Sequence, residues 1–149
     1  MLRTMDILNA INRELVKKFP DRTVYIDRIP KNFERPSFLL EFVTTSLNGK
    51  NKNTVEVTEY YTITCYEETD RCYNSDTVKL IETQSDVLGI FRVGKLEVLD
   101  RCINIKASSS GRDEDIFYID LQVEYFDERG LEEDESEIAE NVIVNYKEV

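Results

Sequence analysis

The sequence of 149 residues contains no histidine, and it has only five glycines and three prolines. The absence of histidine removes the commonest general base, the commonest metal ligand and every Ser-His or Cys-His nucleophile. The glycines, at positions 49, 89, 94, 111 and 130, fit neither a phosphate-binding loop nor a dinucleotide fingerprint. We therefore expect a protein that has no catalytic residues and no cofactor.

The three cysteines, Cys65, Cys72 and Cys102, are also too few and too widely spaced for a zinc site. An odd number of cysteines without a signal peptide favours reduced thiols in a cytoplasm. No apolar run approaches the 18 residues of a membrane span, so we expect no contact with a bilayer.

One acidic cluster, Asp113 to Asp115, could supply oxygen ligands to Mg²⁺ or Ca²⁺. Three successive residues at the tip of a hairpin usually point apart, so the sequence favours a solvated turn. The alternative is a metal-dependent enzyme built on this cluster, and metal-dependent hydrolysis lost on Asp113→Asn and Glu114→Gln would support it.

Negative charge is concentrated at the C-terminal end. The formal net charge is −11, and nine acidic but only two basic residues lie between Asp127 and Val149. That segment accounts for −7, so the first 126 residues are nearly balanced. This distribution argues against a protein that clamps nucleic-acid phosphates or an anionic membrane, and it permits a basic protein partner.

Two segments have the periodicity of amphipathic helices. In residues 4–19 the apolar positions recur at intervals of three and four, with Thr4 as the expected N-cap and Pro20 as the stop. In residues 75–91 a second apolar stripe follows Ser75, which we expect to cap that helix.

The remaining segments predict strands and turns. Strands are expected at 23–29, 38–46, 55–65, 96–107 (two short strands or one bent strand) and 117–125. Polar, glycine-containing turns are expected at 46–54 and 108–115. Several tyrosines along the strands suit either a protein interface or ordinary cross-strand pairing.

These elements predict an α+β fold, in which two helices cover one face of a mainly antiparallel sheet in two layers. The expected order is α-β-β-β-α-β-β. We expect one domain at residues 1–127, followed by an acidic C-terminal extension at 128–149.

The order and spacing of these pieces carry a family resemblance. The matching segments are ILNAINRELVKKFPD, VYIDRIPKNFERPSFLLEF, TVEVTEYYTITCY, GKLEVLD and IDLQVEYFDE, which together span about residues 1–127. In this respect the chain resembles the phage tail terminator family, as found in prophages and tail-like particles of Gram-positive bacteria. The acidic extension after Glu128 is longer than this resemblance explains.

The resemblance implies a structural virion assembly protein. It would form a homohexameric ring on the head-proximal end of a finished tail tube, and stop polymerisation of the tube protein. It would also offer a docking surface to the head connector, or a cap in a headless, bacteriocin-like particle. The tube protein, the sheath and the connector are the implied partners, and DNA passes without specific binding. The implied location is the virion or tail-like particle, with assembly in the bacterial cytoplasm.

The two polar turns are the candidate sites of subunit or tube contact. The residues that we select in them are Asn48, Lys50, Lys52, Arg112 and Asp113. The alternative interpretation of both turns is a solvated hairpin tip.

A different class of function also fits the charge: an acidic DNA mimic that inhibits a basic partner. Such a mimic needs carboxylates in a phosphate-like row on a rigid surface, whereas here most of the excess charge lies in the last 23 residues.

Overall fold

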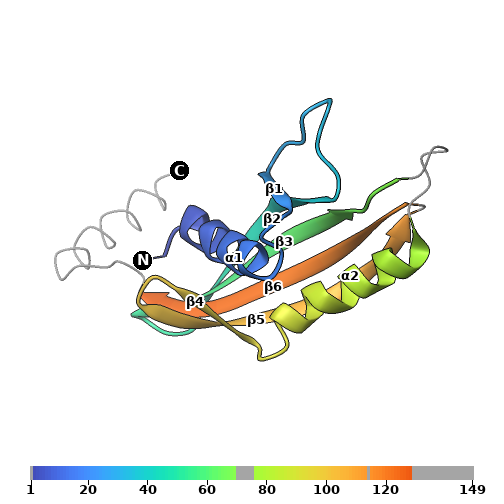
Figure 1. The fold of residues 1–149 in the computed structure, drawn as a ribbon. Coiled ribbons are helices and arrows are strands. Elements are labelled where there is room, and N and C mark those ends of the chain that lie inside the picture. Colours follow the sequence, from blue (N-terminus) through green and yellow to red (C-terminus); the bar gives the residue numbers. More distant parts are fainter. Residues whose placement is uncertain (1, 70–75, 114, 129–149) are drawn as a thin grey trace, which may run out of the picture.

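The structure is a computed structural model that describes residues 2–69, 76–113 and 115–128. Within these ranges the chain forms two helices and six strands (Figure 1). In chain order they are α1 (Thr4–Lys18), β1 (Thr23–Ile26), β2 (Ser37–Gly49), β3 (Thr54–Tyr66), α2 (Thr77–Ile90), β4 (Lys95–Val98), β5 (Arg101–Asp113) and β6 (Ile116–Glu128).

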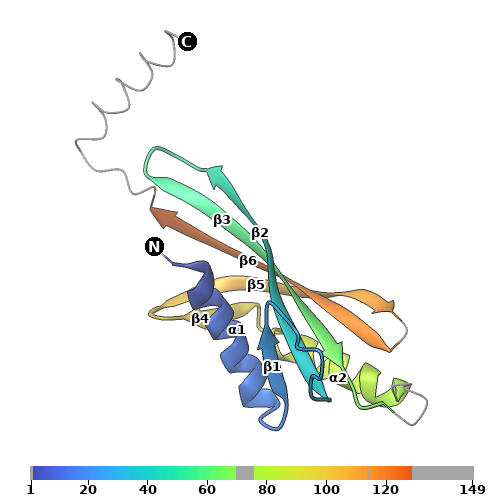
Figure 2. The same ribbon diagram turned by 90° about the horizontal axis from the view of Figure 1, so that it is seen from above.

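The six strands form one sheet in the order β1-β2-β3-β6-β5-β4. All neighbouring strands are antiparallel except β1 and β2, which are parallel. Both helices pack on the same side of this sheet (Figure 2). The predicted α+β fold, with a mainly antiparallel sheet covered by two helices, is therefore confirmed.

The observed order has one strand more than the predicted one. β4 and β5 are separate strands, joined by a tight turn in which Leu99 has a positive φ of 55°. Val98 pairs directly with Arg101 across that turn. The reading of this region as one bent strand is therefore wrong.

The predicted turn over residues 108–115 is also wrong, because β5 continues to Asp113. Ser109 pairs with Ile119 and Gly111 with Tyr118, with a register shift between the two pairs that marks a bulge. The β-bulge accommodates the glycine at φ 111°. Polar composition indicated a loop, but pairing with the apolar strand β6 decides the structure.

The other predicted turn is shorter than expected. β2 extends to Gly49 and β3 begins at Thr54, so only residues 50–53 connect the two strands. Asn51 stabilises the connection, because its side-chain oxygen accepts hydrogen bonds from the backbone N–H groups of Asn53 and Thr54.

Both helices begin with a different cap from the one expected. The N-cap of α1 is Arg3 rather than Thr4, and the Asp6 carboxylate accepts a hydrogen bond from the Arg3 N–H at 3.0 Å. Asp76 caps α2, with its side chain accepting from the N–H groups of Val78 and Lys79. Ser75, the expected cap, lies outside the described residues.

The core lies between the helices and the sheet. On α1, Leu8, Ile11 and Leu15 are buried on one face, as their spacing predicts. The inward side chains of β6 alternate along the whole strand, and those buried are Phe117, Ile119, Leu121, Val123 and Tyr125. Burying each large apolar side chain contributes about 1.5–3 kcal/mol, which holds the helices against the sheet.

Candidate functional site

The edge of the sheet at β2 is only partly paired. β1 pairs with residues 37–40 alone, so within the described chain no strand pairs with residues 41–49 on that side. We call this segment the β2 open edge. It exposes Phe42, Val43 and Leu47, the last with 63% of its surface accessible. Long, exposed apolar edges are unusual in isolated monomers because they template pairing with another chain.

The opposite edge, at β5, has the same property. β4 pairs with residues 101–104, and the Ile105 N–H donates to the Gly94 carbonyl at 3.0 Å. Residues 106–113 have no further strand partner among the described residues, and we call them the β5 open edge. Its residues 107–111 are Ala, Ser, Ser, Ser and Gly, so the side chains along this edge are small and mostly polar.

The structure separates the five candidate contact residues into two groups. Asn48 lies at the end of β2, and Lys50 and Lys52 lie in the turn that follows. The Lys50 Nζ is 2.8 Å from the Glu56 carboxylate, so this cation is already paired within the chain.

Arg112 and Asp113 lie at the far end of the sheet. Asp113 pairs with Ile116, which in turn pairs with Tyr66 at the end of β3. The turn at 50–53 instead adjoins Thr54, at the start of β3. The 13 residues of β3 span roughly 40 Å. The two groups therefore lie at opposite ends of the sheet.

The face of the sheet away from the helices carries an open groove of about 630 Å³. Tyr60, Thr62 and Asp120 line it together with Lys106 and Ser108, so it reaches the β5 open edge. The Thr62 hydroxyl donates to the Asp120 carboxylate at 3.3 Å. Tyr60 is 38% exposed on this face, whereas Tyr61 and Tyr125 are buried on the other.

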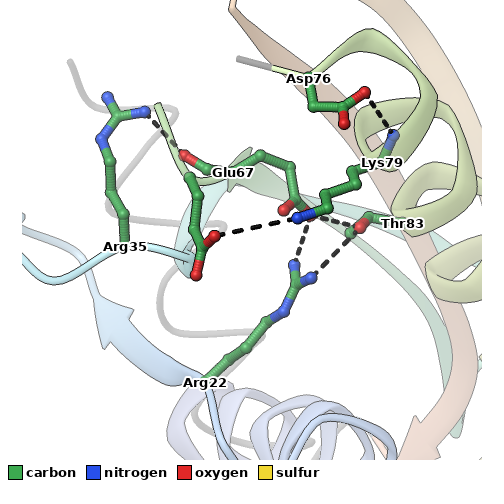
Figure 3. Close-up of polar contacts among 7 residues, drawn as sticks. Arg22, Arg35, Glu67, Asp76, Lys79 and Thr83 are labelled. Carbon is green, nitrogen blue, oxygen red and sulfur yellow. Dashed lines mark hydrogen bonds and ion pairs between the residues drawn. The ribbon is translucent and has the colours of Figure 1, made fainter. Parts of the chain in front are cut away.

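A buried ion pair fixes α2 against the sheet (Figure 3). Arg22 Nη1 lies 2.8 Å from the carboxylate of Glu67, a residue that is only 2% exposed. The same carboxylate accepts a hydrogen bond from the Thr83 hydroxyl of α2. The Arg35 guanidinium donates to the Glu67 backbone carbonyl at 3.0 Å. The cluster holds four segments together through one ion pair and the hydrogen bonds around it.

A second buried carboxylate, Glu59, lies beside two tyrosine hydroxyls. Tyr61 donates to it at 2.5 Å, and the Tyr125 hydroxyl lies 3.5 Å away. Burial, together with the Glu59 charge, raises the pKa of Tyr125 to about 12, and burial also raises the pKa of Tyr61. Glu59 occupies a core position of β3. The sequence alone does not predict this, because a charged residue is normally expected at the surface.

The described cysteines include one core thiol. Cys65 is fully buried, and burial raises the pKa of its thiol. Cys102 is an exposed free thiol on β5, and Cys72 lies outside the described residues.

No group of three metal-ligating side chains comes together among the residues that the structure describes. The Asp113–Asp115 hypothesis lies partly outside this range, since Glu114 is not described. Neither described helix is long and apolar enough to cross a membrane.

Partly unpaired strand edges such as these are surfaces at which another chain can extend the sheet. The sequence matches the family model described as phage tail terminator protein over residues 6–137, and the chain belongs to this family. This is a family of structural proteins, with a role in tail assembly and a location in the virion tail. No curated protein sequence is significantly similar to the chain.

Proposed function

We propose that this protein forms a ring of six copies on the head-proximal end of a tail tube. The ring covers the last layer of tube subunits, so that no further tube protein can add. Its opposite face receives the head connector, or a cap in a headless particle. The protein then acts by binding to the end of the tube and blocking the addition of further tube protein.

Membership of the tail terminator family, across residues 6–137, is the observation that carries this proposal. The two open edges lend support, because a subunit in a closed ring needs two different contact surfaces, one for each neighbour. The net charge of −11 also suits a ring through which DNA passes, because carboxylates repel phosphates.

The described domain gives less support to a DNA mimic. Several of its carboxylates are engaged within the fold rather than aligned on a surface. Glu59 and Glu67 are buried, Glu56 pairs with Lys50, and Asp127 lies 3.7 Å from Arg101. A mimic would depend on the acidic segment that follows.

Deletion of the gene in the phage or prophage that encodes this protein tests the proposal. We expect tails of variable and excessive length, without heads, when particles are measured by electron microscopy. A plasmid copy of the intact gene should restore a single tail length. Tails of normal, uniform length in the deletion strain would refute the proposed function.

A further inference from the structure

The short strands β1 and β4 occupy opposite corners of the sheet. β1 covers the first four residues of β2, and β4 covers the first four residues of β5. Since β2 and β5 run in opposite directions, their open edges lie at opposite ends of the sheet. One chain therefore offers two edges of similar length, placed diagonally.

We propose that neighbouring copies of this protein join by antiparallel pairing of the β2 open edge of one copy with the β5 open edge of the next. The inference rests on the proposed ring and specifies its subunit contact. Three antiparallel steps, from β2 through β3 and β6 to β5, leave β2 and β5 antiparallel within the chain. A neighbour related by rotation about a ring axis roughly along the strands therefore presents its β5 in the antiparallel orientation.

The side chains of the two edges are complementary in size. Leu47 pairs with the buried Val57, and Ala107 with the buried Leu121, so both lie on the helix-covered face. When Leu47 faces Ala107 of the next copy, a large apolar side chain meets a small one on the same face. Pairing of β2 with β2 would instead place bulky side chains together, and such an isologous contact closes at two copies.

The corner strands also set the register between copies. Ser46 is level with Asn104 of its own chain, through Thr58 and Glu124. Because β4 occupies Asn104, the next copy must shift so that Ser108 or a residue near it faces Ser46. The shift is about four to six residues, or roughly 13–20 Å.

A shift of this size is compatible with closure. Four strands spaced about 4.8 Å apart make a sheet roughly 19 Å wide, so the shift corresponds to a strand tilt of about 35–45°. Strands in closed barrels tilt by about 35–45° to the barrel axis. The diagonal placement of the open edges thus favours a closed ring over a flat ribbon.

Disulfide trapping tests the inference in a chain that carries Cys72→Ser and Cys102→Ser. Ser46→Cys with Ser108→Cys probes the four-residue shift, and Asn48→Cys with Ser108→Cys probes the six-residue shift. Both pairs lie on the face away from the helices. The matched control combines Ser46→Cys with Ser85→Cys, which is exposed on α2. Oxidation is carried out on the purified protein and on intact tails.

We expect one of the two edge pairs to give a ladder of covalent oligomers on a denaturing gel without reductant. The control pair and each single cysteine should give monomers. Light scattering shows whether the variants form oligomers, and tail length shows whether they terminate tails. If they do either but neither edge pair gives a ladder in tails, the proposed edge contact is wrong while the proposed function stands. A dimer from Ser46→Cys alone would overturn the inference in favour of β2 self-pairing. The proposed function is tested separately, by the tail lengths of the deletion strain.

Discussion

At the scale of single residues, the Arg22–Glu67 pair carries the clearest energetic consequence. Removing one partner of a buried pair leaves the other charge without compensation. We expect Glu67→Ala to lower the free energy of unfolding by about 3–5 kcal/mol, because Arg22 loses its counter-charge and the Thr83 hydroxyl loses its acceptor. Urea denaturation followed by circular dichroism measures the loss.

The neighbouring Glu68 supplies the control for this prediction. Its carboxylate lies 3.9 Å from the Lys79 ammonium, but its side chain is 64% exposed. We expect Glu68→Ala to change stability by less than about 0.5 kcal/mol, since exposed pairs contribute little. Equal effects of the two substitutions would show that burial does not determine the strength of the Glu67 contact.

The residues of β3 show where the sequence is informative and where it is not. Val57, Tyr61 and Ile63 alternate with polar residues in the sequence of β3, and all three are buried in the core. Glu59 has the same parity, but a carboxylate in a core position becomes intelligible only when the Tyr61 and Tyr125 hydroxyls are brought to it. Tyr125 is 66 positions away, so no local pattern reveals the partner.

At the scale of elements, a substitution on an open edge should affect assembly without affecting folding. Leu47 is 63% exposed, so Leu47→Lys should change the free energy of unfolding by less than about 0.5 kcal/mol. The charge should nevertheless block strand addition at β2, as edge lysines do in natural sheets. We expect loss of oligomers by sedimentation velocity and overlong tails in the phage.

Val93→Lys is the matched control, since Val93 is 83% exposed in the turn before β4 and belongs to neither open edge. It should keep both oligomers and tail length. A Leu47→Lys protein that assembles normally would exclude the β2 open edge from the contact.

Element prediction fails where pairing overrides composition. The alternation in β6 is strong enough to identify the strand from sequence alone. The serine-rich part of β5 has the composition of a turn, yet it becomes a strand because β6 provides a complete partner along its length. Which strand edges stay open depends on the strand order, and the strand order depends on contacts between segments distant in the chain. The open edges therefore cannot be predicted from local sequence patterns.

At the scale of the whole molecule, the question is whether the acidic segment or the folded domain carries the function. Six of its acidic residues can be replaced by their amides, namely Glu132, Glu133, Asp134, Glu135, Glu137 and Glu140. This change removes six negative charges from the total of −11 but leaves the sheet, the helices and both open edges as they are.

We expect the amide variant to terminate tails at the normal length, because termination depends on contacts of the domain with the tube and with neighbouring copies. A DNA mimic would behave in the opposite way, since its affinity for a basic partner scales with its carboxylates and falls with salt. Tail lengths in a complemented deletion strain provide the measurement, and the unmodified gene is the control. If the variant folds and forms rings but the tails are overlong, termination requires the acidic segment.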